Sequence, residues 1–260
     1  MADNFKERFS QAVKETETVV YSYLPEETGH QKTIFEAMNY SVKAGGKRLR
    51  PLLMREVYRL FGGNGPEIEP FMAAMEMIHT SSLIHDDLPC MDNDEYRRGK
   101  LTTWKAYGYD MAVLAGDALM IYAFETASKA FSMGADPAKV GRAIGILAEK
   151  TGIYGMIGGQ TVDVELTGKA VPREKLDFIY RLKTGALLEA SMMIGAVLAG
   201  ATVEEIKEVE TMASEVGLAF QIQDDILDVT STQEELGKPV LSDEKNEKTT
   251  YVTLEGLEKA

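Results

Sequence analysis

The chain has only one cysteine, Cys90, and three histidines among its 260 residues. A single thiol cannot form an intramolecular disulfide or build a cysteine zinc site, and this scarcity is typical of proteins in a reducing compartment. A metallohydrolase centre is conceivable from His85 and Asp86 alone. It would need more histidines than the chain provides, so histidine-based metal chemistry is disfavoured.

Positive charge is also in deficit, because 28 lysines and arginines face 41 aspartates and glutamates, for a formal net charge of −13. Such an acidic balance favours solubility and argues against nonspecific binding of nucleic acid. A polyanionic ligand would therefore have to be held by basic groups that are gathered in one place.

Long apolar runs are scarce too. The first residues carry charges of both signs and no apolar segment of signal-peptide length, which predicts a cytoplasmic protein. The longest apolar stretch, residues 186–203, approaches membrane-spanning length but contains Glu189 and Ser191. Its many small residues favour a buried, closely packed helix over stable insertion into a membrane.

Strand-like alternation is rare, whereas helical periodicity extends through almost the whole sequence. The pattern predicts an all-α fold, with one helix-bundle domain over residues 1–260. Pro70 and Pro89 bound one apolar helix, and glycine clusters, including Gly158-Gly159, mark the expected breaks. The expected helices cover residues 4–23, 30–44, 52–61, 71–88, 109–131, 137–152, 173–200 and 203–229.

Two acidic clusters lie far apart in this helical sequence. Two carboxylates about 5 Å apart repel each other by about 3 kcal/mol at an effective dielectric of about 20, so facing clusters need multivalent cations between them. Mg²⁺ prefers oxygen ligands and commonly binds phosphate groups at the same time. The clusters therefore predict a Mg²⁺ site for a substrate that carries phosphates. They consist of Asp86, Asp87 and Asp92 and of Asp224, Asp225 and Asp228.

On a regular helix, the spacing of the two clusters would place their carboxylates differently. The second spans an arc of about 100° on its helix, together with Gln221, so its carboxylates share one face. In the first, Asp86 and Asp92 would be separated by about 240° of rotation. Pro89 lies between them and is expected to distort the helix end, which would let Asp92 return toward Asp86. His79 precedes Asp86 by two helical turns and would face the same cleft.

Basic residues gather at two glycine-bearing turns, residues 45–51 and 97–100, of which the second directly follows the first acidic cluster. Arginine and lysine side chains bind phosphate oxygens well, so these turns predict the anion-binding part of the site. Lys183-Thr184 is a weaker candidate of the same kind. The polar segment at residues 230–250 could form a lid over the site, although a plain surface loop has the same composition.

Together these motifs resemble those of the trans-polyprenyl diphosphate synthases, a family that includes bacterial-type farnesyl and geranylgeranyl diphosphate synthases. The motifs occur in the family's order, and the resemblance covers nearly the whole chain. They are residues 46–51 (GKRLRP), 79–94 with 97–100 (RRGK), 158–160 (GGQ) with Asp163, 183–184 (KT), 220–225 (FQIQDD) with Asp228, and 237–239 (GKP).

The resemblance implies a helix bundle with a deep central cavity, usually a homodimer, in which the two clusters hold three Mg²⁺ ions around an allylic diphosphate. It makes the direct metal ligands Asp86, Asp92 and Asp224. Their partners would then be Asp87, Asp225 and Asp228.

The resemblance also implies the reaction and the substrate contacts. Mg²⁺ and basic side chains stabilise the leaving pyrophosphate, the double bond of isopentenyl diphosphate attacks the allylic cation that forms, and a proton is lost. Isopentenyl diphosphate would contact Lys47, Arg50, His79 and Arg98. The allylic diphosphate would contact Arg97, Lys183, Thr184, Gln221 and Lys238, with Lys248 closing over it. The catalytic candidates among these are Lys183, Thr184, Gln221 and Lys238.

Product length stays open between fifteen and twenty carbons. In the family, the residues four and five before the first aspartate form a floor beneath the growing chain, and here they are Ser82 and Ser81. Their small size leaves room for twenty carbons, whereas the insertion Pro89-Cys90 is typical of short-product enzymes. A Ser81→Tyr substitution is expected to shorten the product.

Two alternatives remain open. A class I terpene cyclase shares the fold, the first acidic motif and the Mg²⁺-assisted ionisation, but it has no use for a second diphosphate site. A noncatalytic modulating subunit of another prenyl synthase is the other alternative, although such a subunit is expected to lose metal ligands. Relatives usually continue for one or two helices beyond a position like Ala260, so either these residues omit a C-terminal segment or the cavity is closed differently.

Overall fold

The computed structural model describes residues 2–169, 171–231 and 249–258. Its α-helices are α1 (Ala2–Ser22), α2 (Lys32–Val42), α3 (Leu49–Leu60), α4 (Glu69–Asp86), α5 (Thr103–Tyr107), α6 (Tyr109–Ser128), α7 (Pro137–Thr151), α8 (Met156–Leu166), α9 (Arg173–Ile179), α10 (Ala186–Ala199), α11 (Val203–Thr230) and α14 (Tyr251–Glu255). Shorter elements are η1 (Pro66–Ile68), η2 (Lys129–Met133), the π-helical turn η3 (Tyr180–Gly185) and the strands β1 (Tyr96–Arg97) and β2 (Lys100–Leu101).

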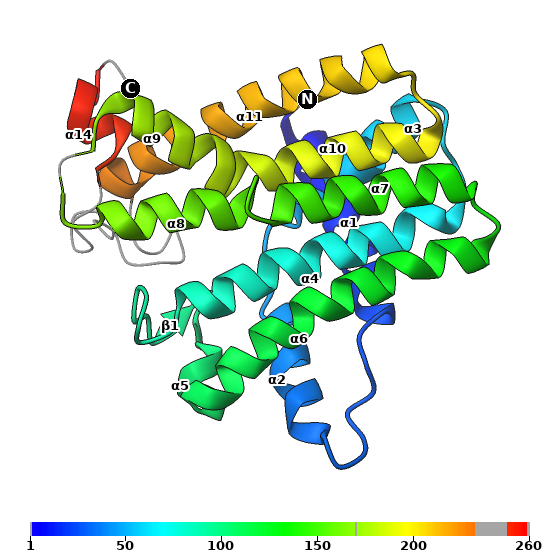
Figure 1. Cartoon of the computed structure of the whole chain (residues 1–260), viewed down its shortest axis with the longest axis horizontal. Coiled ribbons are helices and arrows are strands. Elements are labelled where there is room, and N and C mark those ends of the chain that lie inside the picture. Colours follow the sequence, from blue (N-terminus) through cyan, green and yellow to red (C-terminus); the bar gives the residue numbers. More distant parts are fainter. Residues whose placement is uncertain (1, 170, 232–248, 259–260) are drawn as a thin grey trace.

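Most of the long helices run side by side along the molecule, while α1 crosses behind them and α8, α9 and α14 gather at one end (Figure 1). The strands form a single antiparallel hairpin next to the end of α4. The predicted all-α fold class is therefore confirmed.

Helices α4 and α10 form the centre of the bundle. α10 is buried from Ala186 to Leu198 and packs on α3, α7 and α11, while α4 packs on α1, α3 and α6.

Two stretches, Tyr109–Met133 and Arg173–Ala199, are long and apolar enough to cross a membrane by length and composition. The most apolar window of the second, which contains α10, is 78% buried inside the bundle, whereas that of the first is 39% buried. The expected closely packed helix within residues 186–203 is thus confirmed.

A buried ion network joins three of these helices. The ammonium group of Lys150 on α7 contacts the carboxylate of Glu189 on α10, and it lies 2.6 Å from Glu210 on α11. The Glu189 side chain is 1% exposed. A carboxylate that is removed from water to this extent needs a cationic partner, so Lys150 fixes the packing of α7, α10 and α11.

The expectation that Gly158-Gly159 would interrupt the helices is wrong, because both residues lie inside α8. Packing explains why glycine occurs there. A Cβ at Gly158 would lie 2.2 Å from the Ile153 carbonyl oxygen, and one at Gly159 would lie 2.3 Å from the Lys183 nitrogen. These glycines serve close backbone approach rather than a turn.

The helix boundaries follow their local signals elsewhere. α4 has Pro70 in its first turn and ends three residues before Pro89, and α11 begins with a capping box in which Thr202 and Glu205 bond to each other's backbone amides. The helix expected over residues 173–200 is instead α9, η3 and α10 in succession. Helix α8, the short helices α5 and α14 and the β1–β2 hairpin were not expected.

Candidate active site

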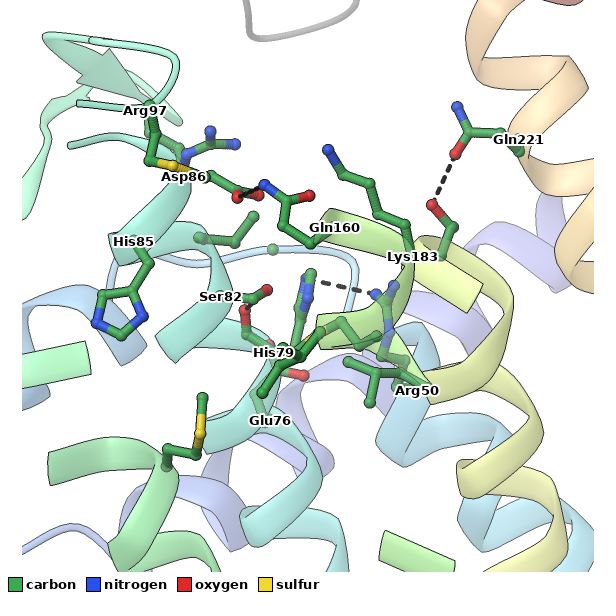
Figure 2. A pocket seen from close by; sticks show the side chains of 18 of the residues that line it. Arg50, Glu76, His79, Ser82, His85, Asp86, Arg97, Gln160, Lys183 and Gln221 are labelled. Carbon is green, nitrogen blue, oxygen red and sulfur yellow. Dashed lines mark hydrogen bonds between the residues drawn. The ribbon is translucent and has the colours of Figure 1, made fainter. Parts of the chain in front are cut away.

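A cavity of about 1090 Å³ lies where α4, α8 and α11 meet the hairpin and η3 (Figure 2). Residues from seven separated sequence segments line it. Its polar lining comprises Lys47, Arg48, Arg50, Glu76, His79, Ser82, His85, Asp86, Arg97, Arg98, Asp117, Gln160, Thr161, Glu165, Lys183, Thr184, Gln221 and Asp224. The apolar lining comprises Leu49, Leu83, Met91, Met120, Met156, Ile157, Val164, Leu187 and Phe220, in addition to Gly46.

The first acidic cluster is gathered by a sharp turn at the end of α4. The backbone amide of Asp92 donates to the carbonyl oxygen of Asp86 at 2.9 Å, so the predicted return of the chain across Pro89 is confirmed. Asp92 itself is not part of the cavity lining. Asp86 lines the cavity, whereas Asp87 is buried behind it and is held by Arg97, with Nη2 to Oδ1 at 2.6 Å. Burial raises the pKa of Asp87 to about 6, although the Arg97 guanidinium lowers it.

The second acidic cluster divides between cavity and core. Asp224 lines the cavity, whereas Asp225 and Asp228 are each 2% exposed and lie outside its lining. One oxygen of Asp225 accepts hydrogen bonds from the Tyr180 hydroxyl at 2.6 Å and from the Tyr251 amide at 3.0 Å. Burial raises the pKa of Asp225 despite these bonds. Asp225 thereby joins η3 and α14 to α11.

Helix α8 contacts both sides of the cavity with two polar residues one turn apart. The side-chain amide of Gln160 donates to Asp86 at 2.7 Å, and Asp163 accepts from the Lys183 ammonium group at 2.6 Å. Figure 2 shows Lys183 reaching toward Gln160 from η3. The other amide atom, Oε1 of Gln160, is buried and has no hydrogen-bond partner among the described residues.

The donor set suits Mg²⁺. Within the described ranges, no group of three or more His, Cys, Asp or Glu side chains is close enough together to coordinate a metal ion by itself. Mg²⁺ rarely uses such a cage, because it binds one or two carboxylates together with waters and substrate phosphates. Asp86 and Asp224 provide cavity-facing carboxylates on different helices, and the unpaired oxygen of Gln160 could accept a hydrogen bond from a metal-bound water.

Basic groups occupy the end of the cavity near α3. Nη1 of Arg50 lies 3.4 Å from Nε2 of His79, and the buried Nε of Arg50 has no hydrogen-bond partner within the described structure. Burial lowers the pKa of Arg50 to about 10. Burial, together with the nearby guanidinium groups of Arg50 and Arg98, holds the pKa of His79 well below its ordinary value of 6.5. His79 is therefore neutral at physiological pH, while the arginines remain cationic.

The hairpin adds two more arginines. Arg97 pairs with Lys100 across the hairpin, which leaves Arg98 and Gly99 as its central residues, both with positive φ. This is the conformation of the two-residue turn that matches strand twist. Arg98 donates to the carbonyl oxygen of Gly45, so the two glycine-bearing basic turns are in direct contact.

The π-helical turn η3 brings Lys183 and Thr184 to the cavity. The Thr184 hydroxyl donates to the side chain of Gln221 at 2.8 Å, which links η3 to α11 next to Asp224. A π turn inserts an extra residue into a helix and often occurs at functional sites. Lys238 and Lys248 lie outside the described residues.

The chain-length candidates differ in position. Ser82 lines the cavity. Ser81 is fully buried, does not border the cavity, and donates to the Ile78 carbonyl oxygen at 2.8 Å.

Several cavity residues were not among the sequence candidates. Glu76 and Asp117 give no sequence signal, because each is a single acid within an apolar helix. Gln160 belongs to the GGQ motif that carries the family resemblance, but the sequence assigned it no role at the site. Asp163 lies on the same helix face outside the cavity lining, and this spacing could have identified the pair. Arg48 belongs to a basic turn that was recognised, but its burial is visible only in the structure.

The sequence profile of the polyprenyl synthetase family matches residues 31–260. The chain belongs to the polyprenyl synthetase family. It is 50% identical over 228 residues to a chloroplastic geranylgeranyl pyrophosphate synthase of Capsicum annuum, an alignment that covers 87% of this chain and 62% of that protein. The chain thus spans less than two thirds of that relative.

Bacterial members of the family align over more of their length. The farnesyl diphosphate synthase of Geobacillus stearothermophilus is 44% identical over 258 residues, which is 99% of this chain and 86% of that protein. The crystal structure of the Helicobacter pylori geranyltransferase complexed with magnesium and isoprenyl diphosphate superposes with a TM-score of 0.84 at 34% identity, covering 97% of this chain and 84% of that one. The sequence matches therefore show the family, and the superposition shows that the fold is the same.

Proposed function

We propose that this chain is a Mg²⁺-dependent trans-prenyltransferase. It condenses isopentenyl diphosphate with an allylic diphosphate (dimethylallyl, geranyl or farnesyl diphosphate) to give a prenyl diphosphate of fifteen or twenty carbons and free pyrophosphate. One observation carries the proposal: a single cavity combines carboxylates from two acidic clusters, a basic end and an apolar lining. Residues 1–260 are taken as one polyprenyl synthase domain.

Two anion sites follow from the two groups of cations. The end with Lys47, Arg50, His79 and Arg98 suits isopentenyl diphosphate, since a buried Arg50 nitrogen is left for an anionic ligand. The side near η3 and α11 suits the allylic diphosphate. Its contacts would be Arg97, Lys183, Thr184 and Gln221, joined by Lys238 and Lys248.

Three Mg²⁺ ions are proposed from the family resemblance. They would be held by Asp86, Asp92 and Asp224, with support from Asp87, Asp225 and Asp228. When bound, Mg²⁺ would neutralise the charge of the departing pyrophosphate. Lys183 adds a positive charge beside that leaving group, and Gln160 orients the Asp86 carboxylate. The methionines and other apolar residues of the lining keep water away from the allylic cation. His79 is neutral, so it can offer a hydrogen bond to a diphosphate without adding charge to the arginine group.

Ser81 and Ser82 are proposed to set product length. Ser82 borders the cavity below Asp86, and Ser81 occupies the core next to it. A larger side chain at Ser82 would fill space that the growing chain needs. One at Ser81 would have to push its neighbours into that space, so Ser81→Tyr should shift the product toward fewer carbons.

We also propose a cytoplasmic homodimer that does not insert stably into membranes. The outward face of α6 supports the dimer, because Leu114 and Ile121 are 55% and 71% exposed and lie seven residues apart on one side of the helix.

The test is to incubate the purified protein with Mg²⁺ and isopentenyl diphosphate plus dimethylallyl, geranyl or farnesyl diphosphate separately, and to identify the products by mass. Elongated diphosphates are expected, with activity lost on chelation and restored by Mg²⁺. Hydrocarbons formed from an allylic diphosphate alone would indicate a cyclase instead. No elongation with any primer would contradict the catalytic assignment and favour a modulating subunit.

A further inference from the structure

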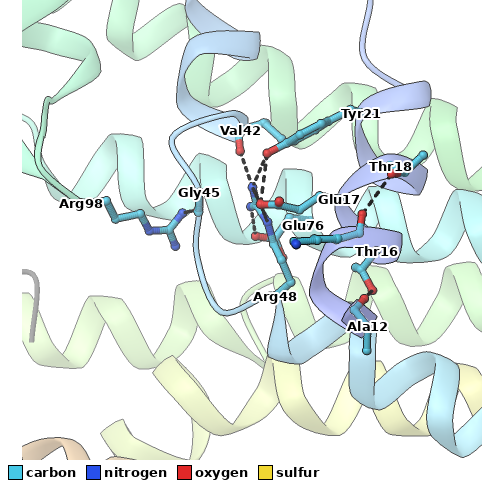
Figure 3. Close-up of polar contacts among 11 residues, drawn as sticks. Ala12, Thr16, Glu17, Thr18, Tyr21, Val42, Gly45, Arg48, Glu76 and Arg98 are labelled. Atoms are coloured by element: carbon cyan, nitrogen blue, oxygen red, sulfur yellow. Dashed lines mark hydrogen bonds and ion pairs between the residues drawn. The ribbon is translucent and has the colours of Figure 1, made fainter. Parts of the chain in front are cut away.

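The basic turn before α3 presents its cationic side chains in two directions. Lys47 is exposed at the cavity rim, and Arg50 approaches His79 within the cavity wall. The side chain of Arg48, between them, is 0% exposed. Arg48 belongs to the cavity lining, but its guanidinium is enclosed by residues of α1 and α4 (Figure 3).

All three nitrogens of the Arg48 guanidinium donate to protein atoms. Nη1 donates to Glu76 at 2.6 Å, and Nε donates to Glu17 at 3.2 Å. Nη2 donates to the Tyr21 hydroxyl at 3.1 Å and to the Val42 carbonyl oxygen at 2.8 Å. Glu17 and Tyr21 belong to α1, and no described residue of α1 lines the cavity. Arg48 therefore connects α1 to the turn without being available to a substrate.

The backbone of this turn needs such an anchor. Arg48 has a φ of +51°, and among the described residues only Arg48, Asn93 and Arg98 combine a side chain with positive φ. Residues with a Cβ adopt this region at a cost, and they remain there only when their surroundings hold them. On the opposite side, a Cβ at Gly46 would lie 2.8 Å from Cζ of Arg98. The turn is thus held by Arg98 on the cavity side and by Arg48 on the core side.

We propose that Arg48 is a positioning residue for the isopentenyl diphosphate site, and that Glu17, Tyr21 and Glu76 act through it. This inference rests on the function proposed above. Helix α1 then contributes to the affinity for isopentenyl diphosphate without touching it, because it fixes the turn from which Lys47 and Arg50 reach the phosphates. A turn that is already ordered binds more tightly than one that must be ordered by its ligand.

Tyr21→Phe tests the proposal with a small change. It removes the hydroxyl that accepts from Arg48 and keeps the ring, which lies 5.8 Å from the guanidinium carbon. The KM for isopentenyl diphosphate should rise about fivefold, since a hydrogen bond to a charged group is lost. The kcat and the KM for the allylic diphosphate should stay within about twofold. Arg48→Lys keeps the charge but not the forked contacts, so its KM for isopentenyl diphosphate should rise about tenfold.

Tyr122→Phe is the matched control, because it removes a similar phenol hydrogen bond, 3.2 Å to the Tyr23 carbonyl oxygen just after α1, without contact to Arg48. Both KM values should be unchanged in it. The double variant Tyr21→Phe/Arg48→Lys should be no worse than Arg48→Lys, since Tyr21 acts through Arg48. An unchanged KM in Tyr21→Phe, equal rises for both substrates, or effects that multiply in the double variant would overturn the proposal. Absence of elongation by the unsubstituted protein would contradict the proposed function instead.

Discussion

Two adjacent aspartates on α11 have opposite surroundings. Asp224 borders the cavity, whereas Asp225 is buried and accepts hydrogen bonds from Tyr180, Tyr251 and Gln221. The cavity-lining carboxylate is the one proposed to act on metal and substrate, while the carboxylate that joins three elements is expected to act on stability. The same chemical change at the two positions is therefore expected to have different consequences.

Asp224→Asn is expected to lower kcat/KM by about 10²-fold or more, since it removes a carboxylate that is proposed to hold Mg²⁺. Its free energy of unfolding should change by less than that of Asp225→Asn, because Asp224 is less buried than Asp225. Asp225→Asn should instead lose about 1–3 kcal/mol. If the asparagine oxygen keeps the bonds from Tyr180 and Tyr251, its amide nitrogen meets the Nε2 donor of Gln221 and cannot accept from it. Urea unfolding and steady-state kinetics measure both. Equal stability losses in the two variants would contradict this division.

His79 gives a pH dependence whose sign is determined. Its pKa in the folded protein is held below the ordinary value of 6.5 by burial and by the nearby arginines. Between the two pKa values the unfolded chain binds a proton that the folded protein excludes, so the stability from a neutral His79 is complete above about pH 6.5 and is lost as pH falls.

The variant His79→Gln should lack this contribution. As the pH falls, its free energy of unfolding should decrease less steeply than that of the unsubstituted protein. The two slopes should differ by up to about 1.4 kcal/mol per pH unit below pH 6.5. Urea unfolding of both ligand-free proteins from pH 7 to pH 5 measures the slopes. Identical slopes for the two proteins would show that His79 does not titrate in this way.

At the scale of elements, the approach of α8 to η3 decides where Lys183 lies. The backbone of η3 is so near α8 that a Cβ at Gly159 would lie 2.3 Å from the Lys183 nitrogen. On the other side, a Cβ at Gly217 of α11 would lie 2.9 Å from the Cα of Gly185. The π turn is therefore held between two helices by glycine contacts, and its side chains reach the cavity from there.

Gly159→Ala is expected to displace η3, because the new methyl group meets backbone that cannot rotate away. The variant should lose about 1–3 kcal/mol of unfolding free energy, and its kcat should fall as Lys183 moves. Gly145→Ala on the exposed side of α7 is the control, since its Cβ would meet nothing within 4 Å. It should gain about 0.5–1 kcal/mol, as alanine does in a helix interior. Circular dichroism melts and the elongation assay distinguish the two; equal behaviour would contradict the close-contact explanation.

At the scale of the whole molecule, α6 has one face in the core and the other uncovered. Leu114 and Ile121 lie on the uncovered side, with partly buried Ala118 between them. Two large apolar side chains at this spacing form a stripe that a second copy of the chain could cover, as the proposed homodimer requires.

Ile121→Lys should therefore weaken self-association, because it places a charge in the proposed interface. Light scattering should give close to half the mass of the unsubstituted protein at the same concentration. Leu60→Lys, at the end of α3, is the matched control, since Leu60 is 75% exposed but lies on another helix. A monomeric mass for the unsubstituted protein, or no change in Ile121→Lys, would contradict a dimer through α6.

Local signals were enough to locate most helices and both acidic clusters. Helical periodicity and proline positions depend on neighbouring residues only, so the long helices and the return of Asp92 across Pro89 could be predicted. The same reasoning failed at Gly158-Gly159, since a glycine that permits contact with a distant segment resembles a glycine that ends a helix.

The sequence by itself therefore determined the fold class, the acidic and basic residue types of the site, and the family, because these depend on periodicity and on motifs of adjacent residues. Only the tertiary structure decided how identical side chains divide their roles. Asp224 borders the cavity while Asp225 joins helices, and Arg50 faces the cavity while Arg48 is buried against α1. The physical reason is that burial and hydrogen-bond partners come from elements distant in sequence, and no local pattern records them.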